Sequence, residues 1–132
     1  QKEELAGDLE NARVERYGEG LLVTFDSGLL YDYDSVVVKP TARANLTDLS
    51  NSLRRYPDTE VLIVGHTDSD GAETYNMNLS QRRANAARNF LVSQGIPADR
   101  IRTQAMGESE PVSDNGTEAG KALNRRVEVE VW

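Results

Sequence analysis

The sequence contains no cysteine and a single histidine, His66. Without thiols the chain has no disulfide framework, no cysteine nucleophile and no thiolate metal site. One imidazole near two acids, Asp68 and Asp70, is also a poor zinc site, because zinc is normally bound by several histidines or cysteines. The Gly-x-Ser-x-Gly elbow of serine hydrolases is missing as well. The residues therefore predict a protein that is not an enzyme and carries no cofactor or metal.

The chain also lacks a long apolar run and an excess of positive charge. No stretch approaches the roughly 20 apolar residues that span a bilayer. The formal net charge is −7, from 15 Lys and Arg against 22 Asp and Glu, and an acidic surface repels nucleic-acid phosphates and anionic lipids. We therefore expect no nucleic-acid partner. Because the chain does not begin with Met, we expect any membrane attachment to come only from an anchor upstream of Gln1.

Hydrophobic patterning predicts alternating strands and helices. An apolar stripe of 3.6-residue period through Leu46, Leu49 and Leu53 favours a helix. The predicted strands lie at 20–26, 59–66, 100–106 and 125–132, and the predicted helices begin at Pro40 and near Ser80. This order predicts an α+β fold, a β-α-β-α-β-β sandwich whose mixed sheet carries helices packed on one face. Residues 1–19 are predicted to form a helical or linker segment ahead of one domain at 20–132.

The stretch VGHTDSDGAETYNMNLSQRRA, residues 64–84, joins the buried strand to the following helix and holds the candidate chemistry. Part of it resembles a calcium-binding EF-hand loop, with Asp68 third and Asp70 fifth when Gly71 takes the sixth position. The first position is then a histidine and the twelfth is Met77, where a bidentate glutamate is required. These two mismatches exclude a calcium loop of this type.

Two charges of opposite sign flank the same stretch. Asp68 follows the buried strand, and Arg83 lies near the start of the next predicted helix. A carboxylate holds an ammonium and a guanidinium grips a carboxylate with two hydrogen bonds, so the pair suits the amino-acid end of a ligand. Free N–H groups at a helix start near Ser80 would add to the attraction for the carboxylate. The alternative is a direct ion pair between Asp68 and Arg83, which spacing alone favours.

A longer sequence pattern favours the ligand site over the direct ion pair. Its residues are Gly65-His66-Thr67-Asp68, Gly71, Tyr75-Asn76, Leu79-Ser80, Arg83-Ala84, Gly95-Ile96, Arg100-Ile101, Gly107-Glu108, Pro111, Asn115 and Asn124-Arg125-Arg126-Val127-Glu128. In order and spacing the pattern, which runs from about Leu22 to Trp132, resembles the OmpA C-terminal-like family. This family comprises the peptidoglycan-binding modules of outer-membrane proteins such as OmpA, of lipoproteins such as Pal and of the flagellar stator protein MotB.

The resemblance implies a ligand and a site. The ligand is the diaminopimelate of the peptidoglycan stem peptide, whose free amino-acid end carries an ammonium for Asp68 and a carboxylate for Arg83. Further residues that the resemblance places around the ligand are Asn76, Thr67, Leu79, Asp32 and Arg125. For Arg125 and the adjacent Arg126, structural pairing of one of them with an acid at the sheet edge is an equal alternative.

The implied function is noncatalytic binding of the stem peptide, which anchors an outer-membrane or periplasmic protein to the cell wall. The expected location is the periplasmic face of the bacterial outer membrane, where other envelope proteins are further potential partners. The alternative hypothesis is a protein-interaction or assembly module that has the same fold and does not bind the wall.

Overall fold

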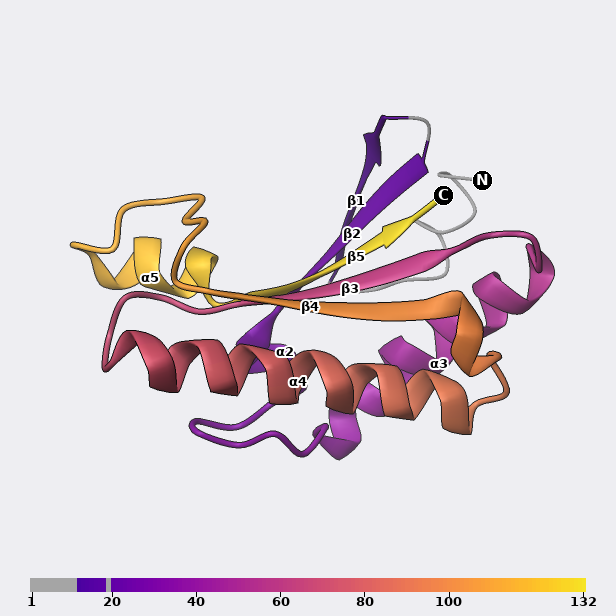
Figure 1. Cartoon of the computed structure of the whole chain (residues 1–132), viewed down its shortest axis with the longest axis horizontal. Coiled ribbons are helices and arrows are strands. Elements are labelled where there is room, and N and C mark those ends of the chain that lie inside the picture. The colour runs from indigo at the N-terminus through magenta and orange to yellow at the C-terminus, as the bar shows by residue number, and fades with distance from the viewer. Residues whose placement is uncertain (1–11, 19) are drawn as a thin grey trace.

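One mixed sheet of five strands, in the order β1-β2-β5-β3-β4, runs through the structure (Figure 1). The computed structural model describes residues 12–18 and 20–132. Its strands are β1 (Ala12–Tyr17), β2 (Gly20–Asp26), β3 (Val61–His66), β4 (Ile101–Gly107) and β5 (Arg126–Val131). β3 and β4 run parallel, and the other neighbouring strands are antiparallel. The predicted α+β class with a mixed sheet is confirmed, and β2 to β5 lie close to their predicted positions.

The helices in the described residues are α2 (Ser27–Leu30), α3 (Pro40–Arg55), α4 (Glu73–Ser93) and α5 (Glu118–Asn124), with a short 3-10 helix, η1 (Ala98–Arg100), before β4. α2, α3 and α4 lie on one side of the sheet, as predicted, whereas α5 lies at the end of the sheet where β5 begins (Figure 1). Among these described helices, none combines the length and the apolar character needed to cross a bilayer.

The core lies between the sheet and the helices on its covered face. The predicted stripe of α3, Leu46, Leu49 and Leu53, is buried there. In β5 every second residue points into the same core, and these residues are Val127, Val129 and Val131. Full burial of such a side chain contributes about 1.5–3 kcal/mol. The core therefore holds α3 and β5 in place with side chains that hydrophobic period alone identifies.

Helix α4 crosses strand β3 in close contact at Gly65. A Cβ built at this position would lie 2.3 Å from the carbonyl oxygen of Ser80, so only glycine permits this approach. The Ser80 hydroxyl donates to the carbonyl oxygen of Met77 (2.9 Å) and accepts from the N–H of Gly107 (3.1 Å). This contact fixes the first half of α4 relative to the end of β3, the two elements that carry most of the predicted site.

The predicted helix start near Ser80 is wrong. α4 begins at Glu73, and Ser80 is buried in its interior. The serine resembled a cap in the sequence, but its hydroxyl is used within the helix and toward β4 instead. Ala72, which does precede the helix, supplies no side-chain cap. The expectation that free N–H groups near Ser80 attract a ligand carboxylate therefore fails.

Residues 12–17 form strand β1 rather than the predicted helix or linker. β1 pairs antiparallel with β2, with Val14 opposite Val23 and Arg13 opposite Thr24. Alternation of apolar and charged residues over this short segment suits a sheet edge with one face on the core. The sheet thus extends beyond the predicted domain boundary at residue 20. The rest of the predicted N-terminal segment, residues 1–11, lies outside the described residues.

Candidate functional site

A cavity of about 410 Å³ opens where the end of β3, the first half of α4 and the loop after α2 meet. We call it the site cavity. Its lining includes every residue that the sequence predicts for the site, namely Thr67, Asp68, Asn76, Leu79, Arg83, Asp32 and Arg125. The lining residues that sequence reasoning missed are Ser27, Gly28, Tyr31, Tyr33, Asp34, Asp70, Tyr75 and Glu118. The proximity of the predicted residues is thus observed, and their roles toward a ligand remain predictions.

Asp68 is held at the end of β3 with both carboxylate oxygens engaged. Its side chain is almost fully buried, and Oδ1 accepts from the N–H of Asp70 at 3.0 Å. Oδ2 accepts from Nη1 of Arg125 at 2.6 Å. The hydroxyl of Thr67 donates to the Asp68 carbonyl oxygen at 2.8 Å. Gly71, whose φ of +83° suits glycine, then turns the chain toward α4. Asp68 is consequently fixed in orientation before any ligand arrives.

Arg83 is fixed independently of Asp68. Its Nε donates to the carbonyl oxygen of Ser35 (2.9 Å) and its Nη2 to that of Asp32 (3.2 Å). The guanidinium lies over the ring of Tyr31, 5.1 Å from the centroid, and the Tyr31 hydroxyl donates to the Arg83 carbonyl oxygen at 2.6 Å. Burial lowers the pKa of Arg83, while Tyr31 and Asp34 act against this shift. The loop after α2 therefore orients the cation.

The direct ion pair that spacing alone favours does not form between these two described residues. Asp68 pairs with Arg125, and Arg83 binds backbone carbonyls. The two groups therefore line one cavity as separate opposite charges. Spacing could not reveal this, because Arg125 lies 57 residues from Asp68 in the sequence.

Asn76 and Leu79 shape the cavity from α4. The Asn76 side-chain nitrogen donates to the carbonyl oxygen of Asp70 (2.8 Å) and lies 3.3 Å from both the Asp68 carbonyl oxygen and Oε1 of Glu108. This nitrogen is therefore already committed to holding the loop that carries Asp68. Leu79 is buried and adds an apolar surface.

The remaining predicted residues have distinct settings. The Asp32 side chain is 79% exposed, 3.8 Å from Lys39, so the residue reaches the cavity at its rim and through its carbonyl. Arg125 also contacts Glu118 at 3.3 Å. Burial lowers the pKa of Arg125, but its hydrogen bonds to Asp68 and Glu118 outweigh this and raise the pKa overall.

The sequence left open whether Arg125 or Arg126 pairs structurally with an acid of the sheet, and Arg126 makes such a pair. Its side chain is buried, with Nε donating to Oε2 of Glu128 at 2.7 Å and Nη2 donating to the carbonyl oxygen of Glu110 at 2.9 Å. Glu128 also lies 3.3 Å from Nε2 of His66, and this histidine, with Arg126, holds the pKa of Glu128 down to about 2. His66 thus packs beside Glu128, which in turn pairs with Arg126. Among the described residues no group of three or more His, Cys, Asp or Glu is arranged to hold a metal.

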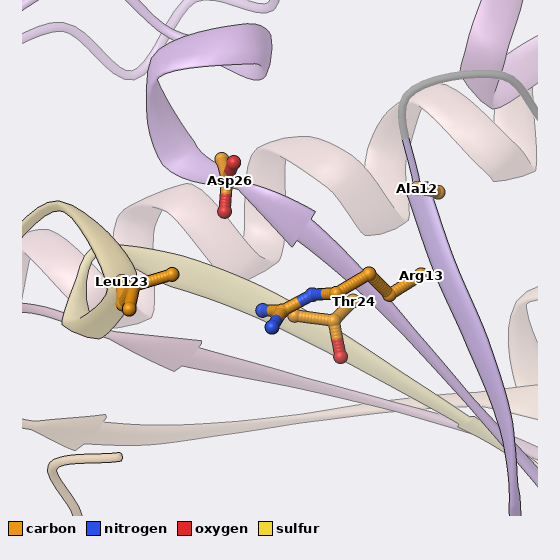
Figure 2. Close-up of a pocket in the computed structure, with 5 residues that line it drawn as sticks. All are labelled: Ala12, Arg13, Thr24, Asp26 and Leu123. Atoms are coloured by element: carbon orange, nitrogen blue, oxygen red, sulfur yellow. The ribbon is translucent and has the colours of Figure 1, made fainter. Parts of the chain in front are cut away.

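Another cavity, of about 340 Å³, lies on the opposite face of the sheet between β1, β2 and α5 (Figure 2). We call it the outer-face cavity. Its lining consists of Ala12, Arg13, Thr24, Asp26 and Leu123. Arg13 and Thr24 alternate with the core residues of their strands, which places them on the face away from α3 and α4. Both Arg13 and Asp26 are exposed.

The structure is a small α+β domain whose site cavity is lined by charges of both signs, with Asp68 and Arg83 each held in place by neighbouring groups. The chain belongs to the OmpA family, whose model matches residues 30–125.

Individual relatives agree with this assignment. The chain is 40% identical over 116 residues to the probable lipoprotein YiaD of Escherichia coli K12, covering 88% of this chain and 53% of YiaD, so it spans about half of that relative. The cell wall anchor of the type VI secretion system (T6SS) from Pseudomonas aeruginosa superposes with a TM-score of 0.89 at 29% identity, covering 98% of this chain and 94% of that structure. The peptidoglycan-associated lipoprotein from Burkholderia pseudomallei gives 0.72 at 32% identity, covering 79% and 88%.

Proposed function

We propose that this domain binds the stem peptide of peptidoglycan through the amino-acid end of diaminopimelate and so anchors an outer-membrane or periplasmic protein to the cell wall. The observation that carries the proposal is the pair Asp68 and Arg83, which line one cavity with opposite charges and are held there by other partners. The names of two related structures, a cell wall anchor and a peptidoglycan-associated lipoprotein, support the same assignment.

In this proposal the ligand ammonium binds the Asp68 carboxylate, and the ligand carboxylate binds Arg83. Among the described contacts, Nη1 of Arg83 has no protein partner, and Nη2 uses one of its two hydrogens on Asp32. These remaining hydrogens suit a carboxylate acceptor. Thr67 and Asn76 hold the loop behind Asp68, Leu79 contacts the aliphatic part of the ligand, and Asp32 marks the rim. No bond is made or broken, so the proposed role is binding alone.

A single zwitterionic end offers few polar contacts and little apolar area, so each domain binds with modest affinity. A cell wall presents the same peptide many times, and a protein held near it rebinds at high effective concentration. Relatives that include an outer-membrane porin and lipoproteins support a site of action at the periplasmic face of the outer membrane.

Calorimetric titration with a diaminopimelate stem peptide tests the proposal. The wild-type domain is expected to bind saturably, and Asp68→Asn and Arg83→Gln are each expected to weaken binding about 30-fold or more, because each removes a charged partner of the ligand. Matched controls are Asp99→Asn and Arg82→Gln, two exposed charges outside the site cavity. They should bind as the wild type does.

Co-sedimentation with purified wall sacculi extends the test to the polymer. A folded wild-type domain that binds neither peptide nor sacculi would contradict the proposal. That result would favour the alternative of a protein-interaction module with the same fold.

A further inference from the structure

Asp68, the anionic end of the site cavity, is already paired with a cation, the guanidinium of Arg125. Nη1 of Arg125 donates to Oδ2 of Asp68 at 2.6 Å, and the other carboxylate oxygen accepts from the N–H of Asp70. An incoming ammonium therefore meets a carboxylate whose two oxygens both have partners. Arg83, in contrast, is held by backbone carbonyls and leaves donors toward the cavity. The two ends of the site are thus not equivalent.

We propose that Arg125 competes with the ligand ammonium for Asp68 and thereby selects ligands that carry a carboxylate beside the ammonium. This inference rests on the proposed function, and it assigns to Arg125 a selective role in place of a simple contact. A lone amine that takes the place of Arg125 on Oδ2 of Asp68 offers the displaced guanidinium nothing in return. A zwitterionic end displaces Arg125 but brings a carboxylate that accepts from Arg83 and from the released Arg125.

The setting of Arg125 allows this exchange. Its side chain is 36% exposed, and it follows the last residue of the short helix α5. A second acceptor, Glu118, lies on that same helix, 3.3 Å from Nη2 of Arg125 and largely exposed. The guanidinium can therefore leave Asp68 by side-chain rotation and keep one carboxylate partner. No change in the backbone of β3 or α4 is needed.

The chemical consequence is discrimination between diaminopimelate and lysine. Both side chains end in an ammonium, but only diaminopimelate carries a carboxylate on the same carbon. Arg83 already favours the zwitterion by attraction. Arg125 adds to this preference by making the amine without a carboxylate compete for its anion, so selectivity comes from both an attractive and a competing group.

Two stem peptides that differ only in diaminopimelate or lysine at one position test the inference by calorimetry. In Arg125→Gln the affinity for the lysine peptide should rise about tenfold, the scale of one released charge-assisted hydrogen bond, while the affinity for the diaminopimelate peptide changes less. The ratio of the two affinities should therefore fall about tenfold. Arg82→Gln removes the same charge from an exposed site on α4 and should keep the wild-type ratio.

Glu118→Gln provides a second variant at an exposed position with the opposite expectation. Without the charge of its alternative acceptor, Arg125 stays on Asp68 more often, and the preference for diaminopimelate should increase. An unchanged ratio in both Arg125→Gln and Glu118→Gln, in a wild-type background that binds the diaminopimelate peptide, would overturn this inference and leave the proposed function standing. Absence of binding by either peptide to the wild type and to every variant would overturn both.

Discussion

The site cavity and the outer-face cavity have similar volumes, about 410 and 340 Å³, and both are lined by arginine and aspartate. In the site cavity Asp68 and Arg83 are each only 7% exposed, and each is held by named neighbours. In the outer-face cavity Arg13 and Asp26 are exposed. Residue type and available space are thus common to both cavities, and what distinguishes the site cavity is that its charges are buried and held in place. Charges fixed before the ligand arrives avoid the entropy of ordering them during binding.

The contact between Gly65 and Ser80 holds α4 against β3 beside the site cavity, so we expect its disruption to have the largest effect on stability. Gly65→Ala places a methyl group against the Ser80 backbone oxygen, at 2.3 Å in the unrelaxed structure, and should lower the free energy of unfolding by about 3 kcal/mol. Chemical denaturation measures this. Gly28→Ala is the control, because a Cβ there meets nothing within 4 Å although Gly28 lines the same cavity. Equal stability of the two variants would contradict the expectation.

The outer face of the sheet also carries a fixed charge, that of Glu128, which does not line the outer-face cavity. The pKa of Glu128 is held at about 2, below the ordinary 4.5, by His66 and Arg126. The ionised carboxylate therefore stabilises the fold above pH 4.5, and this contribution, roughly 2 kcal/mol for a half-buried group, is lost as pH falls toward 2. Denaturation between pH 7 and 2 should show the stability difference between the wild type and Glu128→Gln shrinking below pH 4.5.

Glu15→Gln, an exposed acid in β1, is the matched control for that titration. Its stability should follow that of the wild type at every pH. A difference between the wild type and Glu128→Gln that stays constant down to pH 2 would contradict the role given to Glu128.

Removing the Tyr31 hydroxyl tests how this group holds Arg83, the cationic end of the site cavity. Tyr31→Phe removes the 2.6 Å hydrogen bond to the Arg83 carbonyl oxygen and should lower the free energy of unfolding by about 1 kcal/mol. The ring beneath the guanidinium remains, so affinity for the stem peptide should change little. Tyr33→Phe is the control for stability, since Tyr33 is 99% exposed. A large loss of peptide affinity in Tyr31→Phe with unchanged stability would show that the hydroxyl contacts the ligand instead.

The smallest effect is expected in the outer-face cavity. The double variant Arg13→Gln and Asp26→Asn should change stability by less than about 0.5 kcal/mol, as exposed substitutions usually do, and should leave stem-peptide affinity within about twofold of the wild type. Calorimetry and thermal denaturation measure the two quantities. A marked loss of peptide binding in this variant would erase the distinction between the two cavities.

Much of the fold follows from the sequence because hydrophobic period is a local property. The stripe of Leu46 and Leu49 and the alternation of β5 place α3 and β5 directly. Two errors had a common cause: Ser80 resembles a helix cap and Ala12 lies in the segment predicted as helix or linker, but tertiary contacts decide both. Ser80 packs beneath β3, and Ala12 pairs with Phe25 in β2. Local preference is a weak guide where such contacts compete with it.

The site residues were predicted by the family pattern, whereas their mutual contacts were not. The sequence placed Asp68 after the buried strand and Arg83 near the start of the next helix, and it left the roles of Arg125 and Arg126 undecided. Their opposite settings depend on where α5 ends and β5 begins, which brings Arg125 to Asp68 across a long sequence separation. The acids and tyrosines that complete the lining, such as Glu118, carry no periodic pattern that identifies them. Only the folded chain brings them to the cavity.

Strand β1 has a further consequence for the domain among its own copies. It forms one edge of the sheet, where unpaired backbone groups can template pairing with another chain. Its exposed residues Arg13, Glu15 and Arg16 place charges along that edge, which disfavours such pairing. In the proposed function, identical domains bind a wall that repeats one ligand and therefore stand close together at high local concentration. The charges of Arg13, Glu15 and Arg16 disfavour pairing between the edge strands of such neighbouring copies.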